Sequence, residues 1–100
     1  MFIHTVYFWL KEGTPESARE QLIKDCYTYL KAVPTVKQLW AGKPAMTPRE
    51  VVDNSYGVGL TVVLDDSPGH EVYQKHPSHL VFIERNKEIW KRVQVYDYMS

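Results

Sequence analysis

The sequence predicts a small α+β domain whose elements follow the order strand, helix, strand, strand, helix, strand (βαββαβ). Its length of 100 residues is typical of one domain, so residues 1–100 are expected to fold as a single unit. Runs rich in β-branched and aromatic residues alternate with segments whose apolar residues recur at helical spacing. Prolines and glycines lie where these segments are expected to begin or end.

The first strand is expected over Phe2 to Leu10, because aromatic and β-branched residues favour an extended backbone. One face of this strand carries His4, Val6 and Phe8. The opposite face, which includes Tyr7, is also largely apolar. Both faces are therefore expected to be covered.

The first helix is expected to begin after a glycine turn, with Thr14 as its N-cap and Pro15 in the first helical position. Pro34 is expected to end it, because the residue before a proline avoids the helical conformation. Its apolar residues at helical spacing are Ala18, Leu22, Cys26, Tyr29, Leu30 and Val33.

The middle of the chain is expected to contribute a strand, a long loop and another strand. The second strand covers Val36 to Ala41, with Val36, Gln38 and Trp40 on one face. A surface loop without clear periodicity follows from Gly42 to Ser55. The third strand covers Tyr56 to Leu64, and its first face carries Tyr56, Val58, Leu60, Val62 and Leu64. The two glycines on its other face leave room for close approach of a side chain or a ligand.

The last third of the chain is expected to form a broken helix and a final strand. Asp66 or Ser67 caps the first helical piece, and His76 and Pro77 break it. The second piece runs from Ser78 to about Trp90, and Arg92 to Tyr98 forms the strand. Leu80, Ile83, Lys87 and Trp90 are expected near one side of that second piece.

This order of elements indicates the ferredoxin-like arrangement, a split βαβ fold with an antiparallel sheet in the order 4-1-3-2. Both helices then cover one face of the sheet, and the other face stays open. Tyr7 and Trp9 would form an exposed apolar patch on that open face. We therefore expect a homodimer in which the open sheet faces meet.

Composition excludes several classes of partner. Twelve basic and twelve acidic residues give a net charge of zero, so nothing favours binding to nucleic acid or to a membrane surface. The single cysteine, Cys26, fits a reducing compartment and is expected to be buried. The apolar start of the chain lacks the features of a signal peptide, and no run is long enough to cross a bilayer. We expect a cytoplasmic protein.

Histidines and a tyrosine gather at the predicted helix break. His79 falls in the first turn after Pro77, where the helix dipole favours a neutral imidazole that can act as a general base. Tyr73 lies on the preceding piece and could stabilise a developing oxyanion. The alternative is structural: His76 serves the turn with a backbone hydrogen bond, and His79 is an ordinary core or surface histidine.

A second pair is expected from the sheet order. The first and last strands are antiparallel neighbours, so His4 and Asp97 should lie close together. A carboxylate beside an imidazole fixes its tautomer and raises its basicity. The alternative is a purely structural hydrogen bond. Metal-binding spacings such as HExxH or paired cysteines do not occur, and we predict neither a metal ligand nor a cofactor.

Several motifs together resemble the stress-responsive A/B barrel family over nearly the whole chain. They are His4 in the first strand, the Val33-Pro34-Thr35-Val36 step, the Tyr73-Gln74-Lys75-His76-Pro77-Ser78-His79 run and the Val95-Tyr96-Asp97-Tyr98 ending. The resemblance implies a ferredoxin-like fold that dimerises into an α/β barrel. It also implies, from the cofactor-free polyketide cyclases in the family, a catalytic pair of His79 and Tyr73 supported by His4 and Asp97.

The sequence thus leads to three functional hypotheses. The first is a dimeric protein that binds a small apolar or aromatic ligand, with His76, Val6 and Phe8 among the contacts. The second is a cofactor-independent lyase or cyclase in which His79 is the base and Tyr73 positions the substrate oxygen. The third is a haem- or oxygen-using barrel of the small monooxygenase type, with a histidine as haem ligand.

Overall fold

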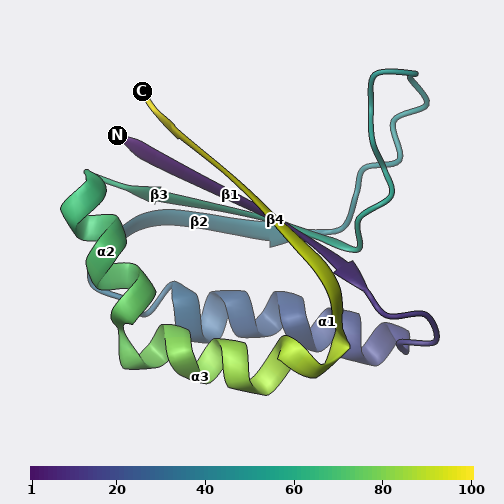
Figure 1. Cartoon of the computed structure of the whole chain (residues 1–100), viewed down its shortest axis with the longest axis horizontal. Helices are drawn as coiled ribbons and strands as arrows, with labels where there is room; N and C mark the ends of the chain where they lie inside the picture. Colours follow the sequence, from purple (N-terminus) through teal and green to yellow (C-terminus); the bar gives the residue numbers. More distant parts are fainter.

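A computed structural model describes all residues from Met1 to Ser100 and shows one antiparallel sheet with three helices on one side of it (Figure 1). The sheet order is β2-β3-β1-β4, which is the predicted order read from the other edge. The α+β, ferredoxin-like fold is therefore confirmed. The elements are β1 (Phe2–Leu10), α1 (Glu16–Asp25), β2 (Val36–Gly42), β3 (Val58–Leu64), α2 (Ser67–Lys75), α3 (Pro77–Asn86) and β4 (Trp90–Met99).

The first helix begins one residue later than its sequence suggests. Thr14 is not the N-cap, because its hydroxyl donates to the carbonyl of Lys11 at 2.6 Å and so closes the preceding turn. Pro15 takes the cap position, and α1 starts at Glu16. The helix continues beyond Asp25 as a π-helical turn over Cys26–Leu30, which keeps the apolar side on the core.

A β-bulge in β2 changes which residues share a face. Val36 pairs with Leu64 and Gln38 pairs with Val63, so Lys37 is an extra residue in the ladder. The bulge turns Val36 toward the core, against which it packs. The prediction that Val36, Gln38 and Trp40 share a face is therefore wrong for Val36.

The third strand is shorter than predicted and its first aromatic residue lies on the opposite face. β3 begins at Val58, and the ring of Tyr56 contacts that of Tyr7, with ring centroids 4.9 Å apart. A side chain at Gly59 would meet the Tyr56 ring at 3.4 Å and the Tyr7 ring at 3.6 Å. The predicted close approach at a glycine is thus confirmed, whereas the prediction that Tyr56 shares a face with Val58 and Leu60 is wrong.

The helical region breaks where proline predicts. The Asp66 carboxylate accepts a hydrogen bond from the amide of Gly69 at 2.8 Å and caps α2. His76 ends α2 and caps α3, because its Nδ1 accepts from the amide of Ser78 at 3.0 Å. This contact is the structural role that the sequence left open for His76.

The boundary between α3 and β4 differs from the prediction. The α-helix ends at Asn86, a 3-10 turn covers Lys87–Ile89, and β4 already begins at Trp90. Leu80 was expected on the same side as Ile83 and Trp90, which pack against the core, but it is 55% exposed, while Phe82 is 2% exposed and belongs to the core.

The core lies between the sheet and the helices and includes one buried acid. Asp25 accepts hydrogen bonds from Arg85, Asn86 and Gln21, which joins α1 to α3. Burial alone would raise the pKa of Asp25, but these hydrogen bonds outweigh it and hold the pKa below its ordinary value. The buried thiol of Cys26 lies in the same layer, as predicted.

The other face of the sheet carries no helix (Figure 1). Aromatic side chains on this open face stay accessible: Trp40, Tyr96 and Tyr98 are 54%, 60% and 58% exposed. No helix in the structure has the length and apolar character needed to cross a bilayer. The loop between β2 and β3 extends away from the sheet, beyond the end of β1.

Candidate functional site

A cavity of about 190 Å³ lies between the helices and the sheet. It is mainly apolar, and its few polar groups come from histidine, tyrosine, glutamine and tryptophan side chains. Such a lining, apolar with a small number of placed polar groups, is typical of small-molecule sites. The lining residues are His4, Val6, Phe8, Leu30, Leu60, Tyr73, Gln74, His79, Phe82, Ile83, Trp90, Val93 and Val95.

The break between α2 and α3 brings Tyr73 and His79 together at this cavity. Tyr73 comes from the last turns of α2 and His79 from the first turn of α3. Their ring centroids are 4.8 Å apart, with the planes at 77°. His79 Nδ1 is buried and has no hydrogen-bond partner in the chain. The chain therefore leaves a hydrogen-bonding atom of His79 unsatisfied beside the cavity.

The protein environment sets the protonation state of both groups. Burial, followed by the nearby imidazoles of His4 and His70, lowers the pKa of His79. Burial also raises the pKa of the Tyr73 phenol, with a smaller contribution from Cys26. At neutral pH, His79 is therefore a neutral imidazole that can accept a proton, and Tyr73 is a phenol that can donate a hydrogen bond.

His4 and Asp97 form the expected pair. They face each other in the β1–β4 ladder, and His4 Nδ1 lies 2.6 Å from the Asp97 carboxylate. The His4 ring lines the cavity and lies 5.7 Å from the Tyr73 ring, centroid to centroid. The sheet thus places this pair beside the helical pair at one site.

The predicted ligand contacts divide into two groups. Val6 and Phe8 line the cavity, on the same face of β1 as His4. His76 is not part of the lining, because its Nδ1 caps α3. Its part in ligand binding stays a prediction without a contact in this structure.

Two residues, one in the cavity lining and one next to it, were not predicted as site residues from the sequence. Trp90 lines the cavity with its ring 4.9 Å from that of Phe8, and its Nε1 is buried without a partner. His70 stacks on Phe2 at 4.3 Å, and its Nε2 is also buried and unpartnered. The tryptophan could have been found only if β4 had been predicted to begin two residues earlier.

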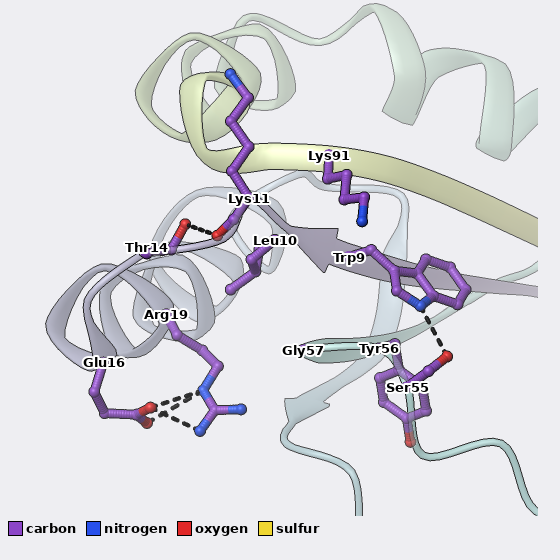
Figure 2. A pocket seen from close by; sticks show the side chains of 11 residues that line it. Trp9, Leu10, Lys11, Thr14, Glu16, Arg19, Ser55, Tyr56, Gly57 and Lys91 are labelled. Atoms are coloured by element: carbon purple, nitrogen blue, oxygen red, sulfur yellow. Dashed lines mark hydrogen bonds and ion pairs between the residues drawn. The ribbon is translucent and has the colours of Figure 1, made fainter.

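A larger but more polar hollow lies where β1 ends, with a volume of about 380 Å³ (Figure 2). Its groups already satisfy one another: Trp9 donates to Ser55 at 2.9 Å, and Arg19 pairs with Glu16 at 2.7 Å. None of the three buried unpartnered atoms of the chain belongs to a residue that lines it. The smaller apolar cavity is therefore the better candidate site.

Comparison with known sequences links the chain to one family. The model of the family described as Stress responsive A/B Barrel Domain matches residues 2–100. No curated protein matches the sequence.

Solved structures of similar shape come from plants and bacteria. A protein from Arabidopsis thaliana is 21% identical with a TM-score of 0.85, and the match covers 100% of this chain and 95% of that chain. A dimeric ferredoxin-like protein of unknown function from Thermobifida fusca is 18% identical with a TM-score of 0.84, covering 99% and 90%. Hydroxynitrile lyase from Passiflora edulis is 15% identical with a TM-score of 0.82, covering 99% and 92%. At these identities the likeness concerns the fold.

Proposed function

The chain belongs to the stress-responsive A/B barrel domain family, and from that premise we propose that it is a homodimer that binds a small apolar or aromatic molecule. The ligand occupies the cavity beside His79 and Tyr73. The single observation that carries this proposal is that two buried polar atoms at the cavity, His79 Nδ1 and Trp90 Nε1, have no partner in the chain. A buried polar atom without a partner costs about 1–3 kcal/mol, which a bound ligand would offset.

The size of the cavity limits the ligand. Pockets for drug-sized molecules measure about 300–1,000 Å³, whereas this cavity measures about 190 Å³. A single aromatic ring with a short polar substituent fits these limits. The indole of Trp90 would donate to an oxygen of the ligand, and His79 would exchange a hydrogen bond with the same substituent. A haem macrocycle is larger than this cavity, so the haem-binding form of the third hypothesis finds no support here.

Nuclear magnetic resonance of the full chain with 4-methylphenol as probe tests this proposal. The three tryptophan indole signals offer an internal comparison, because Trp90 lines the cavity while Trp9 and Trp40 do not. We expect a saturable shift of the Trp90 indole signal alone. Val95→Phe narrows the cavity and should abolish the shift, and Val72→Phe, at an exposed valine outside it, should not. Equal shifts of all three indoles would contradict a cavity site.

A second function, a cofactor-independent lyase or cyclase, is favoured by the paired chemistry of His79 and Tyr73. His79 would remove a proton from a carbon next to a carbonyl group. The Tyr73 hydroxyl would donate a hydrogen bond to the oxygen on which negative charge develops. In a cyclisation, the carbon that has lost its proton would attack a second carbonyl group of the same ligand to form the new carbon–carbon bond, and the protonated His79 would return the proton to the resulting alkoxide oxygen. His4 and Asp97, bonded at 2.6 Å, would hold the adjoining wall in place.

Deuterium exchange of the methyl group of acetophenone in D2O tests this second function, because the probe is one ring with a short carbonyl substituent. We expect exchange above the buffer rate and a loss of about 100-fold in His79→Gln. Tyr73→Phe should lower the rate as well, whereas His76→Asn, which keeps the α3 cap, should retain it. Wild-type exchange no faster than in buffer would exclude this chemistry on the probe and leave the binding proposal unaffected.

A further inference from the structure

Three side chains with metal-binding atoms meet beside the cavity wall. His4 comes from β1, His70 from α2 and Asp97 from β4. One nitrogen or oxygen atom from each lies within 4.8 Å of the other two. The His4 and His70 ring centroids are 4.7 Å apart. The fold therefore brings two imidazoles and a carboxylate together at one place.

The state of His70 shows that this cluster is incomplete. Its Nε2 is buried and has no hydrogen-bond partner, although the ring is held in place by stacking on Phe2 at 4.3 Å. A neutral imidazole nitrogen is the form of histidine that binds metal ions.

We propose that His4, His70 and Asp97 form a binding site for a divalent first-row transition-metal ion, with Zn²⁺ as the ion that we would test first. Two histidine nitrogens and one carboxylate oxygen are a donor set that zinc takes, with water in the fourth position. Imidazole ligands favour such ions over Mg²⁺ and Ca²⁺, which prefer oxygen.

A bound ion would have to bring the three donor atoms, which now lie within 4.8 Å of one another, to tetrahedral spacing. Zinc–ligand distances of about 2.0–2.2 Å place the donor atoms of a tetrahedral site about 3.3 Å apart. His4 Nδ1 and Asp97 Oδ1 are 2.6 Å apart, as befits atoms that share a proton. When the ion binds, that proton passes to the other ring nitrogen of His4, and the two atoms separate slightly. The Asp97 side chain is 35% exposed on an edge strand, which leaves room for this movement.

The metal site shares His4 with the wall of the ligand cavity, but its other two ligands are separate from that cavity. His79 and Tyr73 are not among the three ligands, and neither His70 nor Asp97 lines the cavity. The three ligands also have no motif spacing along the chain, since they come from three separate elements. Loss of metal binding and loss of ligand binding are therefore distinguishable in separate variants.

Calorimetric titration of the full chain, without a histidine tag and after treatment with chelator, tests the proposal with ZnCl2 as probe. We expect one Zn²⁺ per chain, and at least a tenfold loss of affinity in His70→Gln and in Asp97→Asn. His76→Asn is the matched control, because it removes a histidine outside the cluster and keeps a capping side chain. Its affinity should equal that of the wild type.

Histidine ring signals of the wild type give a second measurement that does not depend on a variant folding. Zn²⁺ should shift the signals of His4 and His70 and leave that of His76 in place. Zinc should also raise the melting temperature of the wild type and not that of His70→Gln. Absence of stoichiometric binding, equal binding by His70→Gln, or a loss of binding in His76→Asn would each overturn the proposal.

Discussion

Among single residues, His79 should make the stability of the folded chain depend on pH, because its imidazole is buried in the neutral form. Burial lowers its pKa below 6.5 in the folded chain, and the pKa of His70 moves in the same direction. Between the folded and unfolded pKa values the unfolded chain binds more protons, so stability increases as the pH rises through this window. The folded state should therefore lose stability when the pH falls below about 6.5.

Urea unfolding at pH 7.5 and 5.5 measures this loss. His79→Gln should reduce the difference in the free energy of unfolding between pH 7.5 and pH 5.5, because the variant cannot bind a proton at this position. His70→Gln removes the other histidine with a lowered pKa and should reduce the difference as well. A full wild-type difference in both variants would show that other groups cause the acid sensitivity.

Proximity of residues was predictable where the backbone alone decides it. The pairing of His4 with Asp97 follows from antiparallel neighbours in the sheet, and the structure confirms it at 2.6 Å. The meeting of Tyr73 and His79 follows from a proline break between two helical turns. His70 was not predictable in the same way, because its burial depends on how α2 settles against the Phe2 ring.

Among the secondary-structure elements, the break between α2 and α3 depends on the side chain of His76. His76 Nδ1 accepts from the Ser78 amide, one of the donors that a helix start leaves unpaired. His76→Ala should lower the free energy of unfolding by about 1 kcal/mol, whereas His76→Asn should nearly retain it. Urea unfolding of the two variants decides the matter, and equal losses in both would rule out capping as the function of this side chain.

The elements themselves were predicted better than their edges and faces. The strand order follows from the order of helical and extended segments along the chain. The spacing of the apolar residues reveals that order. The bulge at Lys37 and the early start of β4 at Trp90 do not appear in that period. One extra residue in a ladder reverses the face of everything on one side of it. This is why Val36 was assigned to the wrong face. Trp90 was assigned to a helix for another reason, because its spacing from Ile83 and Lys87 fits the helical period.

At the scale of the whole molecule, we propose that a second copy binds to the open sheet face. Tyr96 is opposite Thr5 in the β1–β4 ladder and is 60% exposed on this face. A stable dimer buries about 1,200–2,000 Å² in total, and an aromatic sheet face without helices can supply such an area. A charge at Tyr96 would have to be desolvated in that interface.

Sedimentation at micromolar concentration tests this assembly. The wild type should be a dimer and Tyr96→Asp a monomer, or at least tenfold weaker in association. Val72→Asp places the same charge at an exposed valine on α2, in the helical layer, and should stay a dimer. A monomeric wild type would contradict the barrel arrangement, and a dimeric Tyr96→Asp would place the interface elsewhere.

The β1–β4 ladder also has a consequence for the time course of folding. His4 and Asp97 are separated by 93 positions, so their contact closes a loop that contains nearly every other residue. Pairing of such distant segments slows folding, because the chain loses conformational entropy on loop closure before the stabilising contacts have formed. Helices can form early during synthesis, but this contact requires β4 to have left the ribosome. In refolding, we expect the His4 ring signal to reach its native position in the slowest phase, together with global folding.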